Sequence, residues 1–154
     1  MYISITLKWD YTAMHVDLSM PKYVTKALHK FKNSLQNFLP NNKPEYSVHK
    51  HVETNYGQKV QYAEHADDTP ILDSVDINLI QKIVGTFLYY GIAVDNTIIV
   101  ALSTISSEQS AATSNTVKKI TQLLNYLATN PDATIRYTRS DMVLWVHSDS
   151  SYLS

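Results

Sequence analysis

The side chains in this 154-residue sequence that could do chemistry are of two kinds, and the stronger signal is a row of cations. Between residues 20 and 33 the cations recur at four-and-three spacing, which places them on one side of a helix. Point charges arranged in this way can neutralise successive phosphates of a nucleic-acid backbone without reading any base. A lysine-rich outer face is also what any solvated helix needs, so both interpretations stay open. The row consists of Lys22, Lys26, His29 and Lys30.

The second kind is an isolated acid near the end of the sequence. Asp149 follows an apolar run and would share a strand face with His147, a pair that a small hydrolase could use. No nucleophile with an orienting partner surrounds the pair, which argues against that class. His49 and His51 stand two residues apart, but no third metal ligand follows at a recognisable spacing. The chain has no cysteine, so thiol chemistry and disulfides are excluded.

Composition and charge indicate a globular protein with one basic segment. The chain is 44% hydrophobic and 18% charged, and its length suits one domain. Residues 20–50 carry a net charge of +5, whereas residues 51–110 carry −6, which favours one face for an anionic partner. No leader pattern opens the chain, and the longest aliphatic run is far short of a membrane span. We expect a soluble intracellular protein, cytoplasmic or nuclear, not secreted and without membrane contact.

The densest apolar pattern lies between residues 76 and 109 and predicts two packed helices. The first run recurs at three-and-four spacing, with Ser74 or Asp76 placed to cap its start. Asp95–Asn96 interrupts the pattern before a second run begins. Helices joined by so few residues usually pack antiparallel, so the pattern predicts a helical hairpin in the core. The apolar positions are Ile77, Ile80, Val84, Phe87, Leu88 and Gly91, then Ile98, Ile99, Ala101, Leu102 and Ile105.

Strands are predicted at both ends of the chain. Residues 3–9 and 14–18 alternate between apolar and polar types around a turn, which predicts a β-hairpin with one buried face. Residues 134–137 and 142–147 predict a second hairpin.

Two further helices flank the helical hairpin in the sequence. Ser19–Met20–Pro21 is expected to open the basic helix, and Thr113 or Ser114 to cap another that ends at Asn130–Pro131. The expected fold class is therefore α+β, with an N-terminal β-hairpin, a bundle of about four helices and a C-terminal β-hairpin. The shared core is expected to contain Val24, Leu28, Phe31, Ile80, Val84, Phe87, Leu88, Leu102, Leu123 and Leu127.

The closing segment, residues 142–154 (MVLWVHSDSSYLS), resembles the first ribonuclease H strand of copia-like LTR retrotransposon Gag-Pol polyproteins. In that family an apolar strand runs into a Tyr-or-His, Ser, Asp triplet. Two upstream segments are also similar to blocks of this family and occur in the same order. Residues 85–103 (GTFLYYGIAVDNTIIVALS) resemble its Gly-x-Leu-x-Tyr block, and residues 124–137 (LNYLATNPDATIRY) resemble the helix and turn that lead into ribonuclease H. Residues 3–28 resemble the end of the polymerase palm and the start of the thumb. The resemblance covers nearly the whole chain, and the order of the motifs is more specific than any single motif.

The resemblance implies a connecting region of a reverse transcriptase. Residues 1–39 would be the end of the palm and the first thumb helix, 40–74 an irregular connection, 75–131 the helical connection bundle, and 132–154 a truncated start of a ribonuclease H-like domain. The parent region would grip an RNA–DNA hybrid between two active sites. The expected partners are therefore an RNA–DNA hybrid or another nucleic acid, bound weakly, and the remaining parts of the polyprotein. The alternative is a stand-alone helical module that binds proteins and no nucleic acid.

The family's catalytic residues are largely unmatched in this sequence. The polymerase uses a Tyr-x-Asp-Asp motif in an apolar hairpin, but the only adjacent acids, Asp67–Asp68, lie in a polar connection. Asp149 corresponds to the first of several ribonuclease H carboxylates and is expected to be inactive alone, because two metal ions need several converging carboxylates. Gly91 and Ile92 stand where the family tends to place a basic residue. We expect a pseudogene-like, non-catalytic fragment with no metal site or cofactor, although the parent enzyme would use Mg²⁺.

Overall fold

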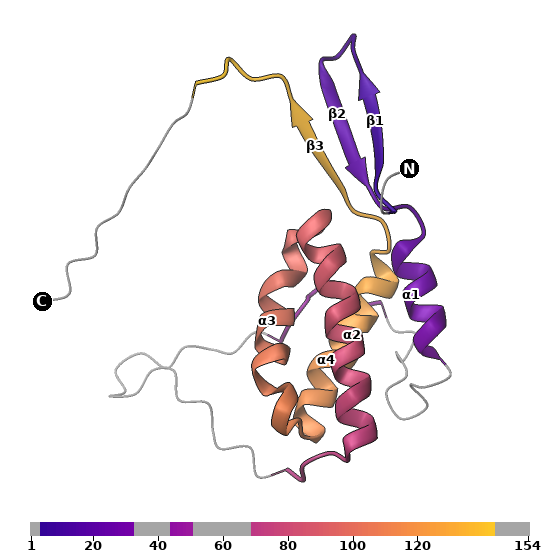
Figure 1. Cartoon of the computed structure of the whole chain (residues 1–154), viewed down its shortest axis with the longest axis vertical. Helices are drawn as coiled ribbons and strands as arrows, with labels where there is room; N and C mark the ends of the chain where they lie inside the picture. Colours follow the sequence, from indigo (N-terminus) through magenta and orange to yellow (C-terminus); the bar gives the residue numbers. More distant parts are fainter. Residues whose placement is uncertain (1–3, 33–43, 51–68, 144–154) are drawn as a thin grey trace, which may run out of the picture.

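The computed structural model describes residues 4–32, 44–50 and 69–143, which form a small antiparallel sheet above a bundle of helices (Figure 1). This arrangement confirms the predicted α+β class. No helix in these ranges is long and apolar enough to cross a membrane. The elements are β1 (Thr6–Asp10), β2 (His15–Ser19), α1 (Tyr23–Lys32), α2 (Ser74–Ala93), η1 (Asn96–Ile98), α3 (Ile99–Glu108), η2 (Gln109–Ala111), α4 (Ser114–Thr129) and β3 (Thr134–Thr138).

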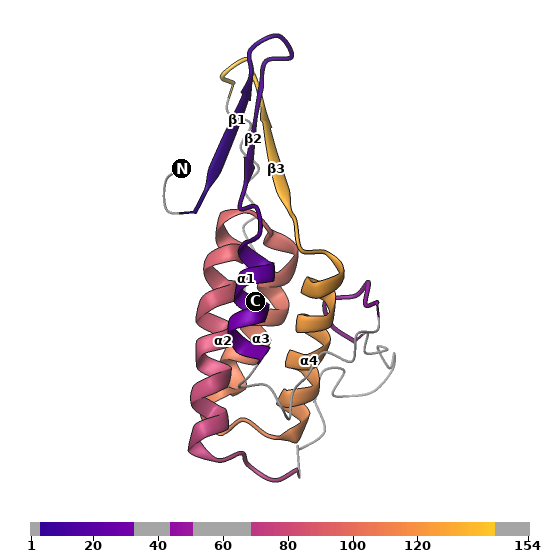
Figure 2. The same cartoon turned by 90° about the vertical axis from the view of Figure 1, so that its right-hand side faces the viewer.

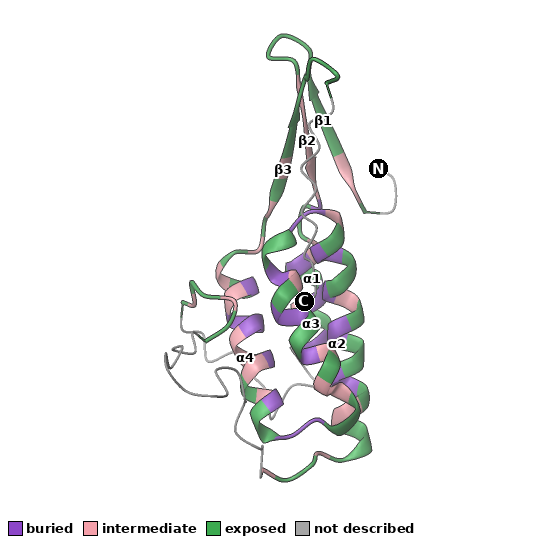
Figure 3. Cartoon of the chain, turned by 90° about the vertical axis from the view of Figure 1, so that its left-hand side faces the viewer, coloured by how far each residue is buried: buried purple, intermediate pink, exposed green. Residues whose placement is uncertain are grey.

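Helix α2 is the centre of the bundle and packs against both α1 and α3, while α4 packs against α1 and α3 (Figure 2). The predicted helical hairpin is confirmed, since α2 and α3 run in opposite directions and are joined by η1. Buried positions line the facing sides of the four helices (Figure 3). The buried residues of α2 are Leu79, Ile80, Ile83, Val84, Phe87, Tyr90 and Gly91.

Two of the predicted core positions need correction. Leu88 is 38% exposed, because it lies about 100° around α2 from Phe87 and so leaves the face that meets the other helices. Leu28 is only partly buried and packs at the margin of the core. The other eight predicted core residues are buried. Tyr90, which was not predicted, takes a central place with no exposed surface.

The helix starts were predicted in part. Helix α4 has a capping box formed by Thr113 and Thr116, which confirms Thr113 as its cap. The cap of α2 is Asp73, whose carboxylate accepts the N–H of Asp76 at 2.8 Å, so the prediction was wrong by one residue for Ser74 and by three for Asp76. Both acids still lie at the positive end of the helix, which is the favourable end.

The sheet has the order β1-β2-β3, and both neighbouring pairs are antiparallel. The N-terminal hairpin is confirmed, but β3 pairs with β2 rather than forming a separate C-terminal hairpin within the described residues. Residues 142 and 143 are not in a strand, and the rest of the predicted second strand (residues 144–147) lies outside the described residues.

The predicted buried face of the hairpin is mostly exposed, although Leu18 is partly buried against the core. Leu7, Trp9 and Tyr137 alternate onto one face with Val16 and Leu18, yet the first three are 53%, 58% and 56% exposed. The reason is geometric, because the helices lie beyond one end of the strands rather than against a face (Figures 1 and 2). Pairing with β3 widens the sheet to three strands, the smallest size that is ordinarily stable.

The opposite face of the sheet is polar and holds an ion pair between β2 and β3. Arg136 donates from Nε and Nη2 to the two carboxylate oxygens of Asp17, at 2.7 and 2.8 Å. This bidentate geometry is the strongest form of a carboxylate–guanidinium pair. The pKa of Asp17 lies below its ordinary value, first because of the hydrogen bond from Arg136, with His15 and Lys8 adding positive charge.

Acid is therefore expected to weaken the pairing of β2 with β3. Because the pKa of Asp17 is lower in the folded chain, its contribution is complete above the pKa of the unfolded carboxyl and is lost as the pH falls through the folded value. We expect the melting temperature of the Asp17→Asn variant to fall less than that of the unchanged chain between neutral pH and about pH 2. Thermal unfolding followed by circular dichroism measures this difference. Parallel profiles for the two proteins would show that the pair contributes nothing to stability.

Candidate nucleic-acid interface

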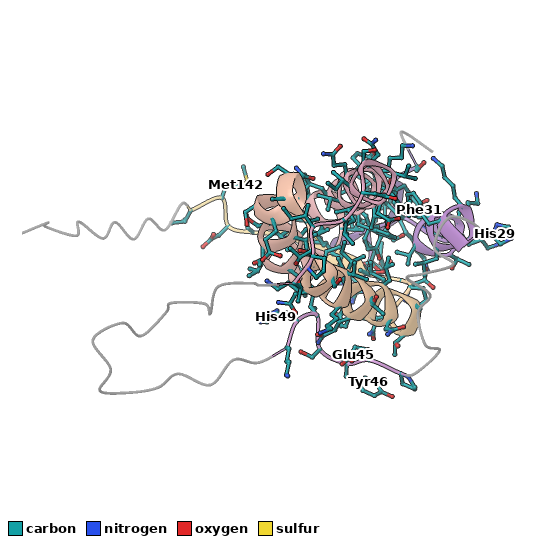
Figure 4. All side chains as sticks on the ribbon, turned by 90° about the horizontal axis from the view of Figure 1, so that it is seen from below. His29, Phe31, Glu45, Tyr46, His49 and Met142 are labelled. Carbon is teal, nitrogen blue, oxygen red and sulfur yellow. The ribbon has the colours of Figure 1, made fainter. Side chains whose placement is uncertain are left out.

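Helix α1 presents an apolar side to the bundle and a basic side to solvent. Val24, Ala27 and Phe31 are buried on the inner side, and Phe31 lies 6.5 Å from Phe87 of α2, measured between ring centroids. In Figure 4, His29 points away from the other helices. All four predicted interface residues are exposed, which agrees with the predicted spacing: Lys22, Lys26, His29 and Lys30.

The start of α1 differs from the prediction and affects the first of these cations. The helix begins at Tyr23, because Ser19 belongs to β2 and Met20 is buried in the core. Lys22 lies in the turn between them with φ = 62°, a left-handed conformation that costs a residue with a side chain about 1 kcal/mol. Its carbonyl nevertheless accepts the N–H of Lys26 at 3.1 Å, which continues the helical pattern. Lys22 is therefore held within one turn of Lys26 on the outer side.

The charges of α1 are not neutralised within the described part of the chain. The helix contains no Asp or Glu, and no ion pair joins Lys22, Lys26 or Lys30 to a carboxylate in the described ranges. Lys30 Nζ lies 5.9 Å from the centroid of the Phe31 ring, a contact that leaves the ammonium open to solvent. By contrast, Lys119 of α4 is paired with Glu108, so its charge serves the contact between α4 and the end of α3.

Other predicted site residues are not brought to this surface. Asp149 and His147 lie outside the described residues, as does His51. His49 is exposed beside α4 (Figure 4). Within the described ranges, no three His, Asp or Glu side chains are grouped closely enough to hold a metal ion.

A shallow cavity of about 430 Å³ lies between α4 and residues 45–50. Ser47 accepts a hydrogen bond from Gln122 through its carbonyl oxygen, and Thr129 accepts the N–H of Glu45, so this segment is fastened to α4. The Oδ1 atom of Asn125, one of the lining residues, is buried and has no hydrogen-bond partner among the described residues. The lining combines one carboxylate and two ammonium groups, which does not define a ligand class. It is lined by Glu45, Lys50, Val117, Lys118, Thr121, Gln122 and Asn125.

The sequence interpretation missed a pair of tyrosines where the sheet meets the bundle. The ring of Tyr23 stacks on that of Tyr90, with centroids 5.6 Å apart and planes inclined by 4°. Tyr90 stands three residues after Phe87 and so lies at the margin of the apolar stripe of α2, where helical spacing does not show whether it is buried. Burial raises the pKa of both hydroxyls above the ordinary value for tyrosine.

No family model, no curated protein and no solved structure matches the chain.

Proposed function

We propose that this chain is a non-catalytic, duplex-holding region of a copia-like reverse transcriptase, whose first helix lies along the phosphate backbone of an RNA–DNA hybrid. Lys22, Lys26, His29 and Lys30 would contact successive phosphates, and no base would be read. The chain itself would do no chemistry. The parent polyprotein, inside the cell, would supply the catalytic carboxylates and their Mg²⁺ ions.

The observation that carries this proposal is the charge on the outer side of α1, which no carboxylate of the described residues compensates. A solvated helix usually mixes both signs on its exposed face, which gives favourable pairs at three-and-four spacing. Helix α1 has two exposed lysines, Lys26 and Lys30, beside the exposed His29, and no acid at all. A polyanion that lies along the helix would provide the missing negative charge and would release its own counterions on binding.

Replacement of Lys22, Lys26 and Lys30 by Gln is expected to weaken binding to RNA–DNA hybrids of any sequence. Each lost phosphate contact removes roughly 0.7–0.9 from the slope of log K against log salt, so the slope should flatten by about 2–3. Fluorescence anisotropy of a labelled hybrid, titrated at four salt concentrations, measures both affinity and slope. Gln keeps the length and helix propensity of Lys closely enough to leave the fold intact.

The matched control changes three exposed lysines that belong to other segments than α1. Lys50→Gln, Lys82→Gln and Lys118→Gln together alter the net charge by the same amount. The control should retain the salt slope of the unchanged chain. Equal flattening in both triple variants would mean that only overall charge matters, and an unchanged slope in the α1 variant would reject α1 as the interface.

The second candidate function is a helical module that binds a protein. The observation in its favour is exposed apolar surface on the bundle, where α2 presents Leu88 and Ile92 one turn apart and α3 presents Val100. Exposed apolar groups of this kind mark docking sites when they are contiguous. Indifference of the unchanged chain to nucleic acid at low salt would favour this function over duplex binding.

A further inference from the structure

The sheet meets the bundle only at one end, so few contacts determine its direction. Its strands pack mainly on one another, and none of them has an extensive interface with a helix of the described chain (Figures 1 and 2). Two short connections join the two parts: residues 20–22 lead from β2 to α1, and residues 130–133 lead from α4 to β3. Free rotation at these connections would leave the sheet without a fixed orientation.

One side chain of α2 contacts the second connection directly and the residue that follows the first. Tyr90 Oη accepts the N–H of Ala133 at 3.0 Å and donates to the carbonyl oxygen of Pro131 at 3.5 Å. Its ring stacks on Tyr23, the first residue of α1. The Tyr23 hydroxyl in turn donates to the carbonyl oxygen of Thr86, one turn before Tyr90 on α2, at 3.1 Å. The last residue before β3 and the first residue after the β2–α1 turn are thus tied to the same part of α2.

The hydroxyl of Tyr90 is not required to fill the core. A Phe side chain would occupy nearly the same volume and would bury no polar group. Burying a hydroxyl costs free energy unless the hydroxyl is hydrogen-bonded. Tyr90 has no exposed surface, and the hydroxyl reaches 43 residues along the chain to Ala133. The Ala133 N–H is the last backbone donor before β3, so this bond acts directly where the strand leaves the bundle.

We propose that Tyr90 is a positioning residue whose hydroxyl fixes the orientation of the three-stranded sheet relative to the helices. With the bond in place, the sheet and the basic side of α1 form one rigid unit. Without it, residues 130–133 can rotate and the sheet turns about its remaining contacts. This inference holds whether or not the chain binds nucleic acid.

The test is the distance between the sheet and the bundle in the Tyr90→Phe variant. The chain has no cysteine, so spin labels can be attached at Thr12→Cys in the β1–β2 turn and Ser103→Cys on α3. Both positions are exposed. We expect the distribution of distances between the two labels, measured by double electron–electron resonance, to broaden and shift in Tyr90→Phe. Tyr126→Phe is the matched control, since its hydroxyl shares a hydrogen bond with Thr97 rather than with Tyr23 or residues 130–133.

A second measurement is amide hydrogen exchange. The Ala133 N–H should be protected in the unchanged chain, and Tyr90→Phe should raise its exchange rate about 5- to 30-fold, as expected for loss of one buried hydrogen bond. A fully unprotected Ala133 amide in the unchanged chain would overturn the proposal. A distance distribution in folded Tyr90→Phe identical to that of the unchanged chain would also overturn it.

Discussion

Phe87→Ala is expected to lower the free energy of unfolding by about 3–5 kcal/mol. The ring has no exposed surface and lies at the junction of α2 with α1, in tilted contact with Phe31. Its removal would leave a cavity between the two helices. Other contacts hold the helices in place, so they cannot move together to fill the cavity completely. Urea denaturation of the variant and of the unchanged chain measures this loss. The slope of the unfolding free energy against urea concentration is compared between the two proteins.

The neighbouring residue gives the control for this substitution. Leu88→Ala removes a side chain of similar apolar character from the same turn of α2, but Leu88 is 38% exposed. We expect this change to cost about 1 kcal/mol or less, because much of the side chain is already in water. Similar losses for the two variants would show that Leu88 belongs to the core, as its sequence spacing first indicated.

Gly91→Leu is expected to destabilise the chain by about 1–3 kcal/mol through overpacking. A Cβ atom at Gly91 would lie 3.1 Å from Cγ1 of Ile98 and 3.4 Å from Cγ1 of Ile99. Ile98 is completely buried, so it has little room to move when the rest of a leucine side chain is added. Thermal and chemical denaturation of the variant measure the effect.

Gly85→Leu provides the opposite expectation on the same helix. A Cβ at Gly85 would have no atom within 4 Å, and the position is exposed in the middle of α2. Glycine in a helix interior is less favourable than leucine by about 0.5–1 kcal/mol, so this variant should be more stable than the unchanged chain. If both leucine variants gained stability, the close approach of Gly91 to η1 would not constrain packing.

The helices could be predicted well because each carries a repeating inner face. The three-and-four spacing in α2, α3 and α4 placed most of the core correctly, since periodicity depends only on local geometry. Spacing could not decide whether Leu88 or Tyr90 is buried, because the two residues lie on opposite margins of the apolar stripe of α2. The position of α1 decides the question, because Tyr23 of α1 stacks on Tyr90 and covers that margin.

The sheet was predicted less completely because pairing is a long-range property. Alternation identified β1, β2 and β3, but it does not say which strand joins which. It also does not say whether a face will be covered, and the helices lie beyond the end of this sheet. For the candidate interface, the exposure of Lys26, His29 and Lys30 followed from spacing. The bond between Tyr90 and Ala133 has no local signal, because it joins two elements through a single hydroxyl.

The strand order also has a consequence for how the chain folds. The β1–β2 hairpin closes over a four-residue turn, whereas β2 pairs with β3 across more than a hundred residues of chain. Closing a flexible loop of that length costs about 4 kcal/mol in chain entropy, against about 1 kcal/mol for the turn. Formation of the helical bundle brings Ser19 and Thr134 together and removes most of that cost. We therefore expect β3 to pair with β2 only after the bundle has formed, and until then the edge of β2 that accepts β3 is open to pairing with other chains.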